Sequence, residues 1–409
     1  WKLAEPAYVN CVYVAPGNAG TATEAKLQNI DLDPLDIAGL ATFATENDCA
    51  LTVIGPEAPL VAGIVDHFTA AGLPCFGPTR GAAQLEGSKS FSKDFLARHH
   101  IPTAAYAVFS ELDPALAYVR EQGAPIVVKA DGLAAGKGVI VAMTLEEAEE
   151  AIRDMLADNK FGDAGAQVVI EGFLEGEEAS FIVMVDGDNV LPMATSQDHK
   201  RIGDGDTGPN TGGMGAYSPA PVVTALVYQR IMERVILPTV KGMAEEGHSY
   251  TGFLYAGLMI DADDNPSVIE FNCRFGDPET QPILQRLQSD LVSHCQSALE
   301  GTLDTAVAQW DPRPAVGVVL AAGGYPNAYE KGHAIAGLDT PWPATTKVFH
   351  AGTQTQDGNI VTHGGRVLCV SALGNTIEEA IQLAYAGVDH INWQDMIFRQ
   401  DIGWRAIDR

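Results

Sequence analysis

The segment from 251 to 282 constrains the fold of this chain more than any other. Two apolar runs, 252–260 and 267–272, flank a short stretch rich in aspartate and asparagine, which favours chain reversal. This pattern predicts a β-hairpin. On its second strand Glu270 and Asn272 are two residues apart, so both side chains are expected on one face. Carboxylate and amide oxygens suit a Mg²⁺ ion that also binds phosphates, and we expect a metal site there.

A simpler interpretation of this hairpin is a strand that ends in a solvated acidic face. That interpretation accounts for Glu270 alone, but not for the uninterrupted run E-F-N-C-R-F-G-D-P-E that begins with it. A calcium loop starting at Asp261 is excluded because Pro266 occupies the position of the required glycine.

The composition argues against two classes of partner. With 53 acidic and 25 basic residues the chain has a formal net charge of −28, which disfavours nucleic acids and anionic membranes as partners.

The six cysteines are scattered without a C-x-x-C motif, as expected in a reducing cytoplasm. No apolar run is long enough to span a membrane. The chain begins at Trp1 without a methionine, so we expect its start to be missing, and we expect a monomer or weak oligomer.

The length of 409 residues predicts two to four domains. Residues 1–87 alternate between strand-like and helix-like runs, which indicates an α/β domain with a parallel sheet. Residues 88–311 form the central part, in which a smaller α/β unit covers about 107–176. Residues 312–409 have short strands punctuated by glycine, which predicts a small β-rich domain. The fold class is therefore α/β and α+β, with several domains.

The predicted elements follow from hydrophobic periodicity and from end signals. Ser88 is a predicted helix N-cap, and Thr144 with Glu147 forms a predicted capping box. The other strands are predicted at 9–14, 51–54, 75–78, 126–129, 139–142, 168–171, 179–185, 190–194, 316–320, 347–350 and 366–371. The other helices are predicted at 34–45, 61–71, 110–121, 223–245, 281–299 and 376–390.

A glycine-rich loop at 130–138 lies between two predicted strands. Small residues allow backbone N–H groups to approach a phosphate, and Lys129 and Lys137 supply positive charge. The loop is not a Walker A motif, because only three residues separate Gly132 from Gly136 and a glycine follows the lysine. A plain flexible turn is the alternative, although an exposed turn does not need flanking lysines.

A second polar stretch, 196–216, is predicted to be a long flexible loop. A disordered linker is the simplest interpretation, but the run T-G-P-N-T-G-G-M-G is too particular in composition for a spacer, and long loops in compact domains are usually functional. Within it, 203–208 matches G-x-G-x-x-G. No strand precedes that match and no helix follows it, so it does not indicate dinucleotide binding.

Four segments together resemble the glycinamide ribonucleotide synthetase family, also called phosphoribosylamine–glycine ligases, of the ATP-grasp superfamily. They are 127–139, 196–201, 208–218 and 268–281. The resemblance implies an N-terminal α/β domain, a central ATP-grasp domain with a mobile lid, and a small C-terminal domain. It also implies a reaction in which ATP, glycine and 5-phosphoribosylamine give glycinamide ribonucleotide, ADP and phosphate.

The resemblance further implies roles for individual residues. Glu270 and Asn272 would bind Mg²⁺ or Mn²⁺, and Arg274 with Lys129 would stabilise charge on the transferring phosphoryl group. The residues implied for ATP are Lys89, Lys129, Gly136, Lys137, Gly138, Glu171, Phe173, Leu174 and Glu177. The residues implied for the acceptor side are Asp198, Asn210, Thr211, Gly212, Gly213, Met214, Gly215, Asp277, Pro278 and Glu279.

Two departures from the family pattern stand out. Family members begin with a strand and a G-x-G-G-R-E-H loop, which this sequence lacks, and many ATP-grasp enzymes carry another metal-binding acid where this chain has 257–259, Gly-Leu-Met. Two alternatives stay open at this point. One is an ATP-grasp ligase for another carboxylate and amine, and the other is a non-catalytic nucleotide-binding module.

Overall fold

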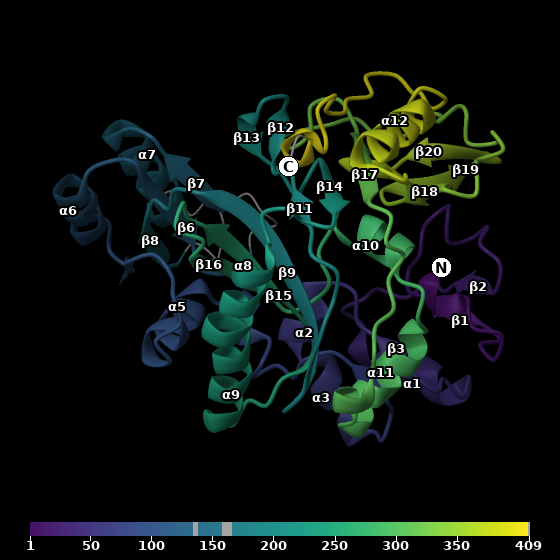
Figure 1. Cartoon of the computed structure of the whole chain (residues 1–409), viewed down its shortest axis with the longest axis horizontal. Helices are drawn as coiled ribbons and strands as arrows, with labels where there is room; N and C mark the ends of the chain where they lie inside the picture. Colours follow the sequence, from purple (N-terminus) through teal and green to yellow (C-terminus); the bar gives the residue numbers. More distant parts are fainter. Residues whose placement is uncertain (134–137, 158–165, 408–409) are drawn as a thin grey trace. The chain divides into compact units, whose positions relative to one another are not determined.

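The computed structural model describes residues 1–133, 138–157 and 166–407. The chain divides into two compact units, each built from separate stretches of sequence (Figure 1). The first unit comprises Trp1–Leu51, Leu191–Pro221 and Phe275–Arg409, and the second comprises Thr52–Val190 and Val222–Arg274. The domain limits at 87 and 311 predicted from the sequence stay predictions.

A small antiparallel sheet with two helices occupies part of the second unit. Its strand order is β5-β8-β6-β7, and buried residues such as Val128 and Ile152 join the sheet to the helices. The capping box of Thr144 and Glu147 is confirmed. The helix predicted at 110–121 begins at Leu112, two residues later than predicted. The elements are β5 (Tyr106–Phe109), α6 (Leu112–Gln122), β6 (Ile126–Ala130), β7 (Val139–Ala142), α7 (Leu145–Leu156) and β8 (Val168–Gly172).

The predicted hairpin is confirmed. Its strands are β15 (Thr251–Ile260) and β16 (Pro266–Asn272), which pair antiparallel. They belong to a sheet of order β10-β9-β15-β16, in which β9 (Glu177–Asp186) pairs with β15 along ten residues and β10 (Val190–Pro192) contains the boundary between the units.

One nearly continuous helical run packs against this sheet. It consists of α8 (Ala225–Ile231), one π-helical turn (Met232–Ile236) and α9 (Leu237–Glu245), close to the predicted 223–245. The ring of Tyr228 meets that of Phe181 on β9 edge-on at 5.3 Å.

The remaining part of the second unit contains the predicted parallel pairing, here of β3 with β4. The helix predicted at 61–71 is wrong in its limits: two helices meet at Gly63, whose φ of +92° ends the first. Ser88 is confirmed as an N-cap, since its Oγ accepts a hydrogen bond from the N–H of Phe91. The elements are β3 (Thr52–Val53), α2 (Glu57–Ala62), α3 (Ile64–Ala70), β4 (Cys75–Phe76), α4 (Gln84–Gly87) and α5 (Lys89–Arg98).

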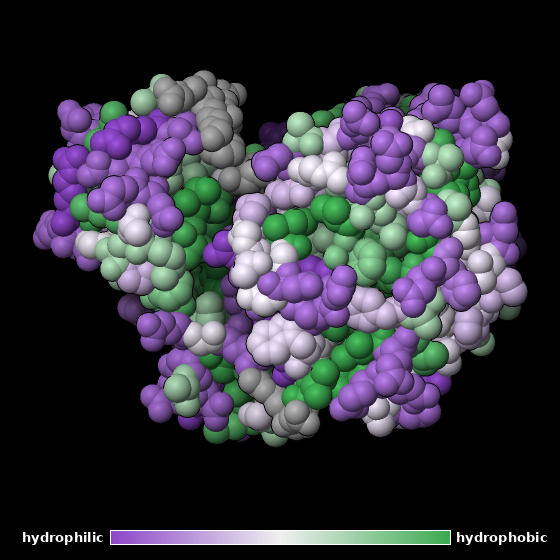
Figure 2. Space-filling model, turned by 90° about the horizontal axis from the view of Figure 1, so that it is seen from above, coloured by the Kyte–Doolittle hydropathy of each residue, from purple (hydrophilic) through white to green (hydrophobic). Residues whose placement is uncertain are grey.

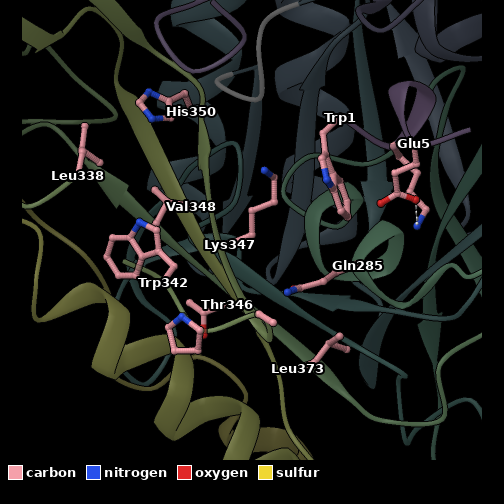
Figure 3. A pocket seen from close by; sticks show the side chains of 13 residues that line it. Trp1, Glu5, Gln285, Leu338, Trp342, Thr346, Lys347, Val348, His350 and Leu373 are labelled. Carbon is pink, nitrogen blue, oxygen red and sulfur yellow. Dashed lines mark ion pairs between the residues drawn. The ribbon is translucent and has the colours of Figure 1, made fainter. Parts of the chain in front are cut away.

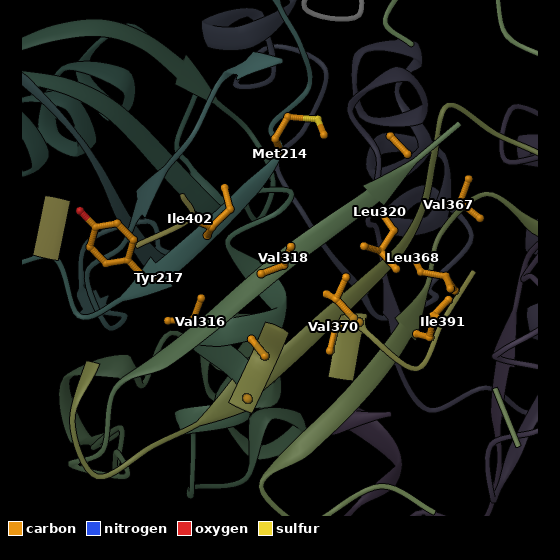
Figure 4. Close-up of a cluster of buried hydrophobic side chains, with 14 of the residues drawn as sticks. Met214, Tyr217, Val316, Val318, Leu320, Val367, Leu368, Val370, Ile391 and Ile402 are labelled. Carbon is orange, nitrogen blue, oxygen red and sulfur yellow. The ribbon is translucent and has the colours of Figure 1, made fainter. Parts of the chain in front are cut away.

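A five-stranded sheet of order β11-β14-β17-β21-β18 forms the centre of the first unit. Val316 and Val318 of β17 belong to the buried cluster in Figure 4, which includes residues of α12. Gly317, between them, faces Pro282 of α10 instead. Because side chains alternate along a strand, α12 and α10 cover opposite faces of the sheet. The elements are β11 (Gln197–Asp198), β14 (Gly215–Ser218), α10 (Thr280–Arg286), β17 (Ala315–Ala321), β18 (Thr346–His350), β21 (Arg366–Leu373) and α12 (Ile377–Val388).

Several predictions in the first unit need correction. The strand predicted at 9–14 is confined to β1 (Val12–Val14), which pairs in parallel with β2 (Leu27–Asn29), a strand not predicted. The helix predicted at 281–299 is interrupted, and Asp290 caps its second part, α11 (Leu291–Glu300). The other elements are α1 (Ile37–Glu46), β19 (Thr353–Gln356), β20 (Asn359–Thr362) and short 3₁₀ helices at Lys2–Ala4, Leu303–Thr305 and Trp404–Ala406.

The stretch 196–216 is not the flexible loop expected. It contains β11, β14 and a hairpin of β12 (Arg201–Gly203) with β13 (Thr207–Asn210), and Gln197 and Met214 are buried. These strands were not predicted, because glycine and short polar residues give no apolar alternation and because the partner strands include β17, which is far away in the sequence.

Hydrophilic residues predominate on the face in Figure 2, with hydrophobic areas between them. Within the described ranges, none of the helices combines the length and the apolar character that crossing a membrane requires.

The two helices of the small sheet suggest a stability test. Glu149 of α7 accepts hydrogen bonds from Arg120 of α6, 2.7 Å away, and from Arg153, 2.6 Å away. These bonds lower the pKa of Glu149 to about 2. Because the folded pKa lies below the unfolded one, the stabilisation is complete above the unfolded pKa and is lost as the pH falls through the folded pKa. We expect Glu149→Gln to increase amide hydrogen exchange in α6 and α7 at pH 7.

The matched control is Glu150→Gln, an exposed neighbour for which the described residues show no ion pair. The difference in exchange between Glu149→Gln and the unmodified protein should shrink as the pH falls from 5 towards about 2. A difference that stays constant over that range would contradict the assignment.

Candidate active site

The end of β16 presents the two predicted metal ligands side by side. Glu270 and Asn272 are half-buried, while Phe271 between them is 2% exposed and points to the other face. They pair across the hairpin with Gly257 and Tyr255. The register shifts just before Glu270, so that Ile269 is the additional residue of a β-bulge.

Lys129 at the end of β6 reaches this strand. Its side chain is 3% exposed, and its Nζ donates a hydrogen bond of 2.9 Å to the backbone oxygen of Ile269, next to Glu270. The same Nζ lies 2.9 Å from Oε1 of Glu171 on β8. The predicted phosphate-binding lysine and the predicted metal strand are therefore in direct contact.

Lys93, which the sequence reasoning missed, completes a buried charge cluster. Its Nζ lies 2.7 Å from Oε2 of Glu171 and donates to Oγ1 of Thr103 at 2.7 Å. Burial lowers the pKa of Lys93 to about 8, although Glu171 opposes this shift. The signal in the sequence was its spacing, since Lys93 lies one helical turn after Lys89 on α5.

Lys89 lies at the first position of α5, against the glycine-rich loop. Its Nζ donates to the backbone oxygen of Gly132 at 2.9 Å. Burial lowers the pKa of Lys89, whereas the charge of Glu270 raises it. Gly138 closes the loop by accepting a hydrogen bond of 2.8 Å from the N–H of Ala130. The predicted residues Gly136 and Lys137 lie outside the described residues.

The predicted adenine hinge follows β8. Phe173 is 37% exposed, and no described residue accepts a hydrogen bond from the backbone N–H of Phe173 or Leu174. Glu177, assigned by resemblance to the ribose, is the first residue of β9. The carboxylate of Glu171 is engaged by lysines, so only its backbone could belong to a base-binding edge.

Arg274 is fixed beside β16, the strand predicted to bind metal, by two acids that sequence reasoning did not identify. Its Nε lies 3.2 Å from Oε2 of Glu57, and its Nη2 lies 3.4 Å from Oε1 of Glu86 and 3.3 Å from Oδ1 of Asn272. Glu86 also accepts a hydrogen bond of 2.6 Å from the N–H of Cys273. Burial raises the pKa of Glu86 to about 7, and Arg274 opposes the rise.

The side-chain oxygens of Glu270 and Asn272 fit a divalent ion that takes its remaining ligands from groups other than these two side chains. Among the described residues there is no cluster of three or more acidic, histidine or cysteine side chains around one point. Glu270 and Asn272 supply two hard oxygen donors, and their partners on β15 add no acid. Such a set suits Mg²⁺, which commonly keeps water and phosphate oxygens as ligands.

The residues predicted for the acceptor side lie in the first unit. Arg366 of β21 joins two of their segments, because its Nη1 donates to the backbone oxygen of Gly212 at 2.7 Å and its Nη2 lies 2.9 Å from Oδ2 of Asp277. Gly213 has a φ of +112°, and a Cβ there would lie 2.3 Å from Pro278. Sequence reasoning missed Arg366.

Other residues predicted for the acceptor side are buried as well. Asp198 on β11 and Glu279 at the start of α10 are 8% and 2% exposed. Thr211 is fixed by the backbone oxygen of Lys200, which accepts from its N–H at 2.7 Å and from its Oγ1 at 2.8 Å.

A cavity of about 500 Å³ opens elsewhere in the first unit (Figure 3). Trp342, Lys347 and Gln285 are among its walls, and its described lining includes none of the residues predicted for the site.

Comparison with known proteins links this geometry to a family. Three domain models of phosphoribosylglycinamide synthetase match: the N domain at residues 1–86, the ATP-grasp (A) domain at 87–280 and the C domain at 315–405. The phosphoribosylamine–glycine ligase of Vibrio cholerae is 69% identical over 409 residues, covering all of this chain and 95% of that protein. The enzyme of the same name from Escherichia coli O6:H1 is 67% identical over 410 residues, covering 100% and 96%.

Solved structures agree with this assignment. The crystal structure of phosphoribosylamine–glycine ligase from Thermotoga maritima has a TM-score of 0.84 at 34% identity, covering 98% of this chain and 95% of that one. The biotin carboxylase domain of the Hydrogenobacter thermophilus 2-oxoglutarate carboxylase has a TM-score of 0.73 at 16% identity, covering 95% and 86%, and shares the fold alone. The predicted fold class and the predicted resemblance are both confirmed. The chain belongs to the phosphoribosylglycinamide synthetase family, with its N, ATP-grasp and C domains.

Proposed function

We propose that this chain is an ATP-dependent carbon–nitrogen ligase of de novo purine biosynthesis, which joins glycine to 5-phosphoribosylamine and releases ADP and phosphate. Its relatives carry the name phosphoribosylamine–glycine ligase. The single observation that carries the proposal is the contact of Lys129 with the backbone beside Glu270, because it brings a phosphate-binding cation to a metal-binding strand.

The reaction proceeds in two steps. A carboxylate is a poor acyl donor because its oxide is a poor leaving group, so an oxygen of the glycine carboxylate first attacks the γ-phosphorus of ATP and ADP leaves. The amine nitrogen of 5-phosphoribosylamine then attacks the carbonyl carbon of glycyl phosphate. The C–N bond forms, inorganic phosphate leaves and the nitrogen loses a proton. These steps require positioning and neutralisation of charge.

The phosphate side uses the charges of the second unit. Lys89 and Lys129 hold ATP phosphates beneath the glycine-rich loop, and Arg274 stabilises charge on the transferring phosphoryl group. The backbone at Phe173 and Leu174 binds the adenine edge, with Glu177 on the ribose. Glu270 and Asn272 hold Mg²⁺, or Mn²⁺ in its place. When bound, this ion neutralises phosphate charge.

The acceptor side uses acids and a glycine-rich run of the first unit. The carboxylates of Asp198, Asp277 and Glu279 attract the ammonium group of glycine, and the run 210–215 lines the side that receives the ribosyl phosphate. The N–H groups of residues 211–214 donate to other groups of the protein, so they hold the shape of this run. Arg366 supports this arrangement by holding Gly212 and Asp277 together.

We also propose the three-domain division at 1–87, 88–311 and 312–409, with a lid at about 107–176. The matches of the family models to 1–86, 87–280 and 315–405 support it. A monomer or weak oligomer that acts in the cytoplasm, without nucleic acid or membrane partners, fits the six free cysteines and the net charge of −28.

The function is tested by measuring ADP release from ATP with the purified protein. We expect ADP release over many turnovers only when glycine and 5-phosphoribosylamine are both present, with glycinamide ribonucleotide as product, because the amine must consume glycyl phosphate before the next turnover. Replacing glycine by D-alanine or bicarbonate should abolish product formation. Turnover with one of these instead would indicate a ligase for another carboxylate, and ATP binding without any release would indicate a non-catalytic module.

Replacing Glu270 tests the metal site. We expect Glu270→Gln to lower kcat roughly 10²–10³-fold, because a carboxylate that balances metal charge is lost. The Mg²⁺ concentration for half-maximal activity should rise. The control is Glu245→Gln, which removes one partner of an exposed ion pair with Lys241 on α9. A Glu270→Gln protein with normal kcat and normal Mg²⁺ dependence would refute the assignment.

Replacing Lys89 tests the phosphate site. We expect Lys89→Met to raise the KM for ATP about tenfold or more, since a charge-assisted contact with phosphate is removed. The KM for glycine should change much less. Lys241→Met, at an exposed lysine, is the matched control. Equal changes in both KM values would argue that Lys89 supports the fold of the site without binding ATP.

A further inference from the structure

A segment near the C-terminus forms hydrogen bonds with the part of the chain that contains several of the residues predicted for the acceptor side. We call residues 399–405 the C-terminal segment and residues 198–215 the acceptor loop. The two segments are joined at several points. The N–H of Gln400 donates to Oδ1 of Asp204 at 2.8 Å, and the N–H of Gly205 donates to Oδ2 of Asp401 at 2.8 Å. Both segments belong to the first unit.

Arg399 is the buried centre of this contact. Its side chain is fully buried, and its Nε and Nη2 donate to the two carboxylate oxygens of Asp401, each at 2.7 Å. Its Nη1 donates to Oδ1 of Asp206 at 2.8 Å and to the backbone oxygen of Arg201 at 3.2 Å. A guanidinium group held by two carboxylates in fixed geometry has little freedom to move.

Arg405 extends the contact to a predicted acceptor residue. Its Nη1 donates to the backbone oxygen of Asp198 at 3.2 Å, and its Nη2 pairs with Oδ2 of Asp206. Arg405 is 19% exposed and therefore less essential to the core than Arg399. It connects the C-terminal segment directly to the backbone of Asp198.

His199 fills the space between the two arginines and the strand. Its Nε2 accepts a hydrogen bond of 3.1 Å from the N–H of Gly403, so the proton of the neutral ring is on Nδ1, 4.0 Å from Oδ1 of Asp206. Burial lowers the pKa of His199 to about 3, and the charges of Arg405 and Arg399 add to this effect. The ring is therefore neutral and serves as a spacer.

The backbone of His199 transmits the contact to the other end of the acceptor loop. Its N–H donates to the oxygen of Gly215 at 2.9 Å, and its oxygen accepts from the N–H of Met214 at 2.8 Å. Fixing His199 therefore also fixes Met214 and Gly215. The positive charges of Arg399 and Arg405 balance the negative charges of Asp206 and Asp401. Losing one of these four side chains leaves a partly buried charge without its partner.

We propose that Arg405 is a positioning residue for the acceptor side, acting through the backbone of Asp198 and through Asp206. The inference rests on the proposed function. It adds to that function a dependence of glycine and 5-phosphoribosylamine binding on the C-terminal segment. Arg405 itself does not contact the substrates; it holds the segment that does.

The test compares Arg405→Ala with Arg313→Ala. Arg313 also forms an ion pair with an aspartate, Asp311, in the first unit, but it makes no described contact with the acceptor loop. For Arg405→Ala we expect kcat/KM for glycine or 5-phosphoribosylamine to fall roughly ten- to hundredfold, because small displacements of positioning groups are costly. The KM for ATP should stay within about twofold. Arg405→Lys, which keeps the charge next to Asp206, should recover part of the loss.

A second variant, Asp206→Asn, tests the same proposal if Arg405→Ala fails to fold. Asp206→Asn keeps the shape of the side chain but removes its charge, and it should change the same two kinetic constants in the same direction. Normal values for glycine and 5-phosphoribosylamine in Arg405→Ala, or equal losses for all three substrates in both variants, would overturn the inference. If the unmodified protein forms no glycinamide ribonucleotide, the proposed function fails instead.

Discussion

The buried carboxylate of Glu171 is the interaction on which the second unit depends. It lies between the ammonium groups of Lys93 and Lys129, and Lys129 continues to the backbone of β16. The two ammonium groups, with that of Lys89 nearby, provide cations for the proposed phosphates, and the charge of Glu270 also acts on Lys89 and Lys93. Removing one member of a buried ion pair costs about 3–5 kcal/mol. A substitution in this cluster would therefore change the geometry of the proposed site and lower the stability of the fold at the same time.

The proposed acceptor side is held by the same kind of charged contact, made by different groups. Arg366 joins Gly212 to Asp277, and Arg405 joins the backbone of Asp198 to the C-terminal segment. In each case a guanidinium group holds backbone oxygens of a glycine-rich or polar chain that has little hydrophobic area of its own. Segments of this composition need such contacts, because packing alone cannot fix them.

The sequence predicted what depends on near neighbours. The hairpin of β15 and β16 was predicted because its turn and its apolar alternation are local, and the capping box of Thr144 for the same reason. Lys93, Glu86 and Arg366 were not predicted, since each acquires its role from a partner distant in sequence.

The break at Gly63 and the strands within 196–216 were missed for related reasons. A helix that stops at one left-handed glycine looks continuous by hydrophobic periodicity, and strands such as β14 are defined by a partner strand, here β17. Local patterns do not contain that information.

The bulge at Ile269 has a consequence for how this strand can vary. Val268 and Phe271 pair with Leu258 and Ala256, which lie on one face of β15, although Phe271 follows Val268 by three positions and strict alternation would place the two on opposite faces. The additional residue thus reverses the inward and outward parity of the strand at that point. Without the bulge, strict alternation of the same residues would turn the carboxylate of Glu270 towards the hydrophobic core and the phenyl ring of Phe271 away from it, so keeping this bulge constrains the strand as strictly as keeping its chemistry.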